Sequence, residues 1–545
     1  MVDEMRVEAL FNKGEIPTIE EYLKRCGVNS PKLYIKPDST ANESYENYTN
    51  IWDAMQLLEK ARKGATYHDK HIAIVCDSDC DGYCSSAMAK RFLIHFGVPK
   101  ERISVLFHSG KQHGLSKDIL TQLNKGVGNT PIALIWLPDA GTNDVEACGY
   151  YTDCFNIPVL ITDHHIADRQ NGYGLIVNNQ TSENVTNKDL CGTGVTYKVI
   201  SAYCNMAGDN FHQSIVDLVA LATISDVMDM RSVENRLFVK WGLSHINNTF
   251  LIGLCEAFIA NGNINPTSIA WDIVPKINAV CRSDDAELKQ ELFNALCDDV
   301  WDEGLIDRLR ACHQKQRNEV DKLYQETLAM HPMGDKVKIF VVENTPYSGL
   351  VANKLSDYYS CPVMVVHESY NKYIGSLRSP CPMKTQLNDT NLMTLCMGHE
   401  CACGVGWYKN TTDELIAKCK QLDFTPAVKE VTYSTDNVLM GRELFDMHDE
   451  YMDVWGQGIP EPTVHFSNIT ISGQDIKELG TNKTTIKFLY GDIEFIQFFV
   501  SKEKKELTKV GRNVIMNMEI IGTPSINRFR DKETKQIVIK EMEIK

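Results

Sequence analysis

The chain has 545 residues, of which 43% are hydrophobic and 23% are charged, and its formal net charge is −16. A chain this long exceeds what one hydrophobic core can hold, and its length predicts roughly two to four domains. It contains no run of about 18 apolar residues, which argues against a membrane protein. The acidic charge argues against a protein that coats nucleic acid, but it does not exclude a nuclease with one basic groove.

The N-terminus and the cysteines bear on cellular location. Met1–Arg6 contains two acids, and no uninterrupted apolar core of the kind found in a secretory signal follows it. Without a route to an oxidising compartment, we expect the 18 cysteines to be mostly reduced thiols. We therefore expect a cytoplasmic protein.

The order of apolar runs divides the chain into five segments. Residues 1–65 are predicted to form an irregular or partly helical lead-in. Over 66–283, short apolar strands alternate with helix-length stretches, which is typical of a parallel sheet covered by helices. The charged segment 284–332 predicts a long linker helix, and 333–425 a second α/β lobe. Residues 426–545 predict a small barrel or sandwich, because short strands follow one another there without helices.

A cluster of acids follows the first apolar strand. The sequence Asp77-Ser78-Asp79-Cys80-Asp81-Gly82 comes directly after the run Ile72–Val75. Three carboxylates this close raise one another's pKa, and a divalent cation would relieve the repulsion. An exposed acidic turn commonly holds one or two acids but not three. An EF-hand is excluded because the later bidentate Glu is missing and the flanks are a strand and a helix.

Three further acidic sites follow along the chain. Asp139 ends the apolar run 132–137, Asp163-His164-His165 follows 158–161, and Asp226 lies in an apolar helical stretch. The carboxyl ends of parallel strands meet at one edge of a sheet, so we expect these groups to converge. They predict a pair of divalent ions about 3.5–4 Å apart that clamps a phosphate and activates water. An imidazole among carboxylates favours Mn²⁺, with Mg²⁺ as the alternative.

The order and spacing of these motifs resemble the DHH phosphoesterase superfamily, and specifically RecJ-type exonucleases specific for single-stranded DNA. The resemblance spans about residues 70 to 470 and includes Leu190–Val195, Asp217–Leu221 and Pro275–Arg282. It implies two α/β lobes, DHH and DHHA1, joined by a long helix and followed by a small OB-like β-barrel. It also implies that the metal ligands are Asp79, Asp81, Asp139, His164 and Asp226. His165 would face the substrate phosphate or the leaving group, and Asp163 would orient the two histidines.

One position departs from the family pattern. Many members carry a histidine four residues before the second aspartate of the first motif, where this chain has Val75. We expect Asp77 to take over that ligand role, or one metal ion to be held more weakly.

The second lobe carries two motifs that resemble DHHA1 segments, Gly375–Ser379 and Met397–Gly404. Small residues there let backbone N–H groups approach a phosphate closely. The resemblance implies that the substrate contacts are Arg282, Ser376, Arg378, Ser379, Gly398 and His399. The alternative is a zinc cluster of Cys396, His399, Cys401 and Cys403, which is disfavoured because one-residue spacing between thiols is tight for a tetrahedral site.

The resemblance implies a 5′-to-3′ exonuclease that threads single-stranded DNA between the two lobes, with a role in DNA repair or recombination. A phosphodiesterase for short oligonucleotides or cyclic dinucleotides is the first alternative, although small substrates need neither the linker helix nor the β domain. An inactive scaffold like the Cdc45 relatives is disfavoured, because every acidic site and His164 are present. We expect a monomer that a helicase or a single-strand-binding protein recruits.

Overall fold

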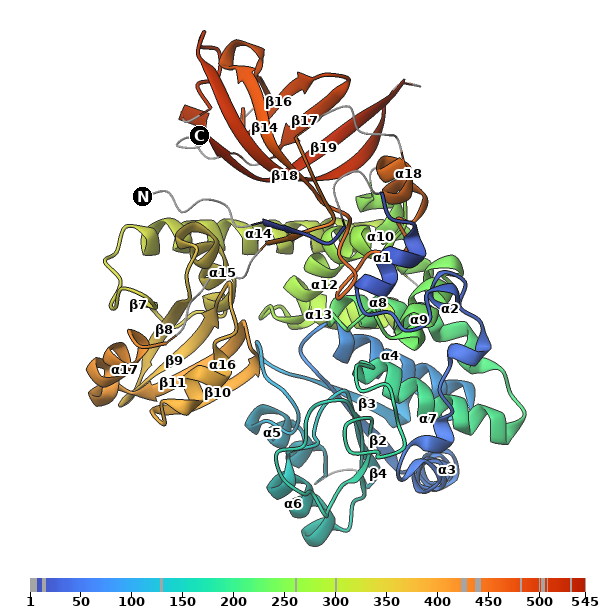
Figure 1. Cartoon of the computed structure of the whole chain (residues 1–545). Coiled ribbons are helices and arrows are strands. Elements are labelled where there is room, and N and C mark those ends of the chain that lie inside the picture. Colours follow the sequence, from blue (N-terminus) through green and yellow to red (C-terminus); the bar gives the residue numbers. More distant parts are fainter. Residues whose placement is uncertain are drawn as a thin grey trace.

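The computed structural model contains two five-stranded sheets and one seven-stranded sheet, each packed on its own hydrophobic core (Figure 1). It describes residues 7–11, 16–127, 131–259, 262–298, 301–422, 429–436, 443–480, 483–498, 500, 505–506, 508–529 and 532–544. Within these ranges, no helix is both long and apolar enough to cross a bilayer.

The first sheet is entirely parallel and runs in the order β3-β2-β4-β5-β6. Its strands are β2 (His71–Cys76), β3 (Ile103–Phe107), β4 (Ile132–Pro138), β5 (Val159–Asp163) and β6 (Leu175–Asn178). The chain leaves β2 for β3 on one side and then crosses to β4 on the other. This change of direction opens a crevice at the carboxyl ends of the strands, where ligands bind in open α/β sheets.

Helices cover both faces of this sheet. One face packs on α3 (Ile51–Tyr67), α4 (Cys80–His95) and α7 (Gly192–Ala207), with α8 (Val216–Ser225) against α4 and α7, and the other face packs on α5 (Lys117–Val127) and α6 (Val145–Phe155). Val75 packs in the core under α5 and α6, so it is a structural residue here. Because α3 belongs to the same core, we propose that the first lobe begins at residue 51 rather than 66.

The segment predicted as one linker helix contains two helices. In α13 (Ala286–Asp298), Leu288, Leu292 and Phe293 are buried in the core of the first lobe. A new helix, α14 (Glu303–Leu328), starts at Asp302, whose side chain accepts a hydrogen bond from the Leu305 amide at 2.8 Å. The linker is therefore α14 alone, because the apolar stripe of α13 is used for packing. Further helices of the first lobe are α9 (Val233–Ser244), α10 (Thr249–Phe258), α11 (Pro266–Ser268) and α12 (Val274–Cys281).

The second lobe is built on a mixed sheet in the order β10-β11-β9-β8-β7. Its strands are β7 (Lys338–Val341), β8 (Val363–Ser369), β9 (Lys372–Arg378), β10 (Met393–His399) and β11 (Ala402–Tyr408). Only β7 and β8 pair in parallel. Its helices are α15 (Ser348–Tyr359), α16 (Lys384–Asp389) and α17 (Thr412–Cys419).

The C-terminal domain is a seven-stranded sheet that surrounds a single core, and it lies across α14 from the two lobes in Figure 1. In sheet order its strands are β13 (Tyr433–Thr435), β14 (Val464–Ser472), β18 (Ile515–Phe529), β19 (Lys532–Ile544), β17 (Ile493–Gln497), β16 (Thr485–Tyr490) and β15 (Lys477–Leu479). Helix α18 (Glu443–Glu450) packs on it.

The N-terminal segment ties the first lobe to the C-terminal domain. Strand β1 (Val7–Ala9) pairs with β12 (Lys429–Val431), and the helices α1 (Ile19–Arg25) and α2 (Pro31–Ile35) follow it. The hydroxyl of Tyr22 donates a hydrogen bond to the Pro460 carbonyl at 2.9 Å, and that of Tyr34 to the Val454 carbonyl at 3.2 Å. This segment thus has a packing role that its irregular sequence pattern did not predict.

Candidate metal centre

The loop between β2 and α4 holds the first acids close to the sheet edge. Asp79 caps α4, and its Oδ1 accepts a hydrogen bond from the Gly82 amide at 3.2 Å. A Cβ atom at Gly82 would lie 2.5 Å from the Cβ of Asp77, so only glycine allows this tight turn. The turn places Asp77, Asp79 and Asp81 together at the carboxyl end of β2.

Asp81 joins two helix N-termini. It lies in the first turn of α4, and its carboxylate accepts hydrogen bonds from the amides of Gly192 at 2.9 Å and Thr193 at 2.8 Å, at the start of α7. A negative group is favoured at a helix N-terminus. A Cβ atom at Gly192 would lie 2.1 Å from Oδ1 of Asp139, so a glycine is needed here for α7 to approach the end of β4.

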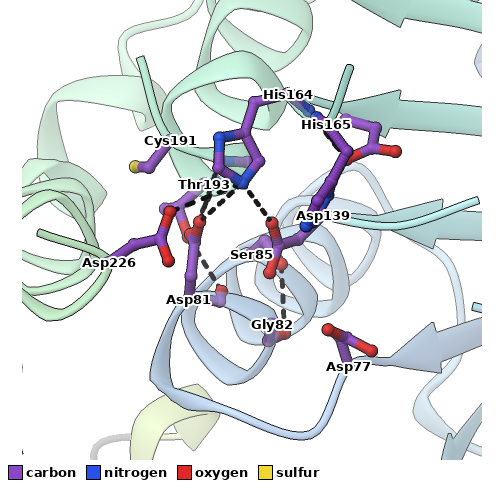
Figure 2. Close-up of polar contacts among 12 residues, drawn as sticks. Asp77, Asp81, Gly82, Ser85, Asp139, His164, His165, Cys191, Thr193 and Asp226 are labelled. Carbon is purple, nitrogen blue, oxygen red and sulfur yellow. Dashed lines mark hydrogen bonds and ion pairs between the residues drawn. The ribbon is translucent and has the colours of Figure 1, made fainter. Parts of the chain in front are cut away.

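His164 lies at the centre of three carboxylates (Figure 2). Its Nε2 is 3.4 Å from Oδ1 of Asp139, 3.5 Å from Oδ2 of Asp226 and 4.0 Å from Oδ2 of Asp81. Asp139 follows β4 with a positive φ of 71°, and Asp226 ends α8. Four groups far apart in sequence therefore meet at one point, and Asp226 reaches it from the end of a helix rather than from a strand end.

The electrostatics of this cluster suit divalent cations. Oδ1 of Asp139 and Oδ1 of Asp77 are buried and accept no hydrogen bond. Burial and the neighbouring carboxylate of Asp81 raise the pKa of Asp139 and of Asp226 well above its usual value. Burial and the nearby His165 lower the pKa of His164, which favours the neutral imidazole that binds metals. Unpaired buried acids beside a neutral imidazole fit a metal site.

Two sets of ligand atoms share this pocket. Asp77, Asp79 and Asp139 form one group in which the ligand atoms all lie within 4.8 Å of one another, and Asp81, His164 and Asp226 form another. Asp139 also groups with Asp163, His164 and His165. Its carboxylate is thus within reach of both sets, which suits a bridging ligand between two ions.

Asp163 holds the two histidines in place. Its Oδ1 accepts hydrogen bonds from the backbone amide of His164 at 2.7 Å and from Nδ1 of His165 at 2.8 Å, and its Oδ2 from the Thr142 amide at 3.0 Å. Burial alone would raise the pKa of Asp163, but these donors lower it below its usual value. For His165, burial opposes protonation, yet the Asp163 carboxylate raises the pKa of this imidazole to about 10. The half-exposed His165 ring keeps Nε2 for another partner.

Two histidines that we did not predict also reach the centre. They lie in the loop after β3, where Nδ1 of His113 is 2.6 Å from Oδ2 of Asp77 and Nε2 of the buried His108 is 3.7 Å from its Oδ1. Asp77 therefore faces two imidazoles as well as the other acids. The signal that could have identified them is the same as for the acids: polar residues directly after an apolar strand, here 103–107.

A cavity of about 950 Å³ lies between the lobes and α14, and Arg282 is the predicted substrate contact among its lining residues. Lys111 and Arg282 line it from the first lobe and Ser348 from the second, while Arg282 Nη2 lies 3.7 Å from Asp79 Oδ2. Oγ of Ser376 is 3.0 Å from Oγ of Ser348. Arg378 is next to them: burial and the positive charge of Arg282 lower its pKa. Basic groups from both lobes thus converge beside the acidic centre.

The remaining predicted contacts are less clearly directed at this cavity. Ser379 is engaged in its own turn, where Oγ donates to the Cys381 carbonyl at 2.6 Å. Gly398 has a φ of 123°, and a Cβ atom there would lie 2.8 Å from the Ala402 carbonyl. The side chain of His399 lies outside the described residues. Near it, Sγ of Cys396 and Cys403 are 3.9 Å apart, but the metal-binding groups found among the described residues are all in the first lobe.

Family comparisons agree with this geometry. Residues 71–223 match the N-terminal domain of the DHH family, and residues 443–541 match the RecJ OB domain. A putative SPbeta prophage-derived single-strand DNA-specific exonuclease, YorK, of Bacillus subtilis is 26% identical over 98% of this chain and 96% of its own length. The single-stranded-DNA-specific exonuclease RecJ of the same organism is 22% identical over 99% of this chain and 70% of its own length.

Solved structures show the same fold. RecJ from Thermus thermophilus in complex with Mn²⁺ superposes with a TM-score of 0.75 at 19% identity, covering 100% of this chain and 80% of that protein. Its complex with Mg²⁺ gives a TM-score of 0.68 over 100% of this chain and 79% of that protein. The arrangement of two lobes, linker helix and C-terminal β domain is therefore the RecJ arrangement.

Proposed function

We propose that the chain is a metal-dependent exonuclease of the DHH phosphoesterase superfamily and of the RecJ type, and that it hydrolyses single-stranded DNA. The observation that carries the proposal is the position of His164 Nε2 within 4.0 Å of three carboxylates, one of them with a buried, unbonded oxygen. YorK, a relative of similar length, is named as a putative single-strand DNA-specific exonuclease, and the longer RecJ of the same organism as a single-stranded-DNA-specific exonuclease. We take the 5′-to-3′ direction from the resemblance to RecJ.

We propose that Asp77, Asp79, Asp81, Asp139, His164 and Asp226 hold two divalent ions, with Mn²⁺ preferred and Mg²⁺ accepted. Two RecJ structures of this fold are described as Mn²⁺ and Mg²⁺ complexes, which supports both choices. Ions in such a site supply positive charge to a phosphate and lower the pKa of water. Asp81 is held by the N-terminal amides of α7, so the chain fixes this ligand before any ion binds.

The remaining side chains are placed to bind and orient the strand. His165 shares its Nδ1 proton with Asp163, which leaves Nε2 to donate to the scissile phosphate or the leaving oxygen. Arg282 and Arg378, from opposite lobes, are suited to grip the adjacent phosphates through their planar guanidinium groups. We assign Ser376, Gly398 and His399 to the terminal phosphate and Ser379 to shaping the turn beside it.

Hydrolysis of end-labelled DNA tests the function. With Mn²⁺, we expect mononucleotides from 5′-labelled single strands at an early time point and from 3′-labelled strands only late. Asp139→Ala and His164→Ala should lower the rate by at least about a thousandfold, because they remove ligands of the ions. The matched control is Asp168→Ala, which removes an exposed acid four residues after His164 and should retain the wild-type rate. Equal rates on blunt duplexes, or cleavage of dinucleotides alone, would contradict the proposal.

We propose a cytoplasmic monomer that a helicase or a single-strand-binding protein recruits to DNA. None of the 18 cysteines, all of which lie in the described ranges, forms a disulfide bond, which suits a reducing compartment. Size-exclusion chromatography with light scattering tests the monomer, since a dimer would have twice the 61.6 kDa mass of the chain.

A further inference from the structure

A cluster of basic and aromatic side chains lies on α10, α12, α14 and the turn before α12, outside the metal centre. We name it the back-face patch, and it consists of Phe258, Trp271, Lys276, Arg310, His313 and Arg317. The residues of α14 that line the inter-lobe cavity are Arg308, Ala311, Cys312, Lys315, Gln316 and Glu319. At 3.6 residues per turn, positions 310, 313 and 317 form a separate stripe on another side of the helix.

The ring of Phe258 brings two cations together. Nζ of Lys276 lies 4.4 Å and the guanidinium carbon of Arg310 lies 5.1 Å from the centre of this ring. The face of an aromatic ring attracts cations, and it can hold two like charges that would otherwise separate. Helices α10, α12 and α14 each contribute one of the three side chains, so the arrangement depends on the tertiary fold.

The positive charge of the patch is only partly compensated. Arg310 pairs with Asp307, but Lys276 and Arg317 form no ion pair with a carboxylate in the part of the chain that the structure describes. Burial and the charges of Arg310 and Arg317 lower the pKa of Lys276, although Asp272 opposes this. The pKa of His313 is also lowered, by burial and by Lys276 and Arg317. In a chain with a net charge of −16, such a concentration of cations suits an anionic ligand.

Trp271 adds an exposed aromatic surface to these cations. Its side chain is 76% exposed, although most tryptophans are largely buried. It lies in the π-helical turn Ile269–Ile273, and such turns often occur at functional sites. The ammonium of Lys276 donates a hydrogen bond to the carbonyl of Asp272, the residue after Trp271. This hydrogen bond ties Lys276 to the turn that carries Trp271.

We infer that the back-face patch is a second contact surface for single-stranded DNA, used by the part of the strand that lies outside the inter-lobe cavity. Trp271 stacks on a base, and Lys276, Arg310 and Arg317 contact phosphates. Aromatic rings interleaved with cations are the usual way in which proteins bind single strands without sequence preference. An acidic peptide would use the cations but gain less from an exposed indole. The inference rests on the proposed function, since it assumes a single-stranded substrate.

Binding of short and long strands tests the inference. The affinity of the full chain for oligothymidylates of six and forty nucleotides is measured by fluorescence anisotropy in EDTA over a range of salt concentrations. In Lys276→Gln/Arg317→Gln we expect the ratio of the 40-mer affinity to the 6-mer affinity to fall about tenfold. We expect the slope of log affinity against log salt for the 40-mer to decrease by about 1.4, because each lost phosphate contact contributes about 0.7 on single strands.

Trp271→Ala should lower the same ratio about five- to tenfold, because it removes a base stack. Trp271→Phe should lower it less, and it should remove most of the tryptophan quenching that the 40-mer causes. The control is Lys63→Gln/Lys322→Gln, which removes two exposed cations from elsewhere on the surface and should leave the ratio unchanged. Because the ratio is internal to each variant, a general loss of folded protein does not mimic the effect.

The outcomes separate this inference from the proposed function. If the wild-type protein degrades single strands with Mn²⁺ but the patch variants keep the wild-type ratio and salt slope, the inference is wrong and the function stands. If the variants lose only the binding of polyglutamate, the patch takes an acidic protein segment and the inference is also wrong. A wild-type chain that degrades no single-stranded DNA would instead contradict the proposed function.

Discussion

Nε2 of His164 lies 3.4 Å from Oδ1 of Asp139, although the two residues follow different strands of the first sheet. That oxygen is buried and accepts no hydrogen bond, and the pKa of Asp139 is raised by burial and by Asp81. The pair therefore combines a carboxyl group that lacks a hydrogen-bond donor with a neutral imidazole. Such a site lowers the free energy of unfolding of the metal-free protein, and the binding of cations raises it again.

Asp139→Asn should separate these two effects. In EDTA we expect the variant to gain about 1–2 kcal/mol in free energy of unfolding, because it removes a buried acid whose ionisation is opposed by burial and by the carboxylate of Asp81. With Mn²⁺ the wild-type melting temperature should rise strongly and that of the variant only slightly. Calorimetric scans with and without Mn²⁺ measure both shifts. A variant that is less stable in EDTA, or that gains as much from Mn²⁺ as the wild type, would contradict the account of the site.

Gly192→Ala should damage the centre without removing a ligand. The added Cβ would lie 2.1 Å from Oδ1 of Asp139, so either the carboxylate or the start of α7 must move. We expect Mn²⁺ affinity to fall about 10- to 100-fold, as it does when groups that orient ligands are changed. Isothermal titration measures this affinity. Gly172→Ala, where a Cβ has no neighbour within 4 Å, is the control and should bind Mn²⁺ normally.

His113→Gln tests whether the unpredicted histidine orients Asp77. The substitution removes the 2.6 Å contact between Nδ1 of His113 and Oδ2 of Asp77. We expect it to lower the affinity for Mn²⁺ about tenfold and to lower kcat, with little change in KM for single-stranded DNA. His95→Gln, which removes a half-exposed histidine that pairs with Asp209, serves as the control. Unchanged metal affinity in His113→Gln would show that Asp77 needs no such support.

Glu59 provides a pH test away from the metal centre. The hydrogen bonds from Arg62, and a further one from the Tyr203 hydroxyl, lower the pKa of this carboxylate to about 2 from 4.5. Because the folded pKa is the lower one, the stabilisation is complete above the unfolded pKa of 4.5 and is lost as pH falls toward 2. We expect Glu59→Gln to melt below the wild type at pH 7, with the difference shrinking below about pH 5. A difference that stays constant from pH 7 to pH 3.5 would refute this assignment.

The sequence predicted those parts of the site that depend on local pattern. Asp77, Asp139 and Asp163 each follow an apolar strand, and parallel strands bring such positions together whatever the details of packing. The long linker and the C-terminal β domain were also predicted from composition and periodicity.

Other features depend on tertiary contacts that no local pattern encodes. His113 reaches Asp77 only because β3 lies beside β2 in the sheet, and Asp81 caps α7 only because Gly192 permits close approach. The N-terminal segment looked irregular because its role is to pair with β12 and to pack on the C-terminal domain. The sequence predicts α13 as part of the linker because the charges of this helix mask its apolar stripe.

The most direct test of the central claim is the rate of mononucleotide release from a 5′-labelled single strand with Mn²⁺, compared between the wild type and His164→Ala in one assay, with Asp168→Ala as control. We expect rapid release by the wild type and the control, none in EDTA, and a loss of at least about a thousandfold in His164→Ala. Release by His164→Ala at a rate close to that of the wild type would contradict the central claim, because hydrolysis would then not depend on the centre around His164.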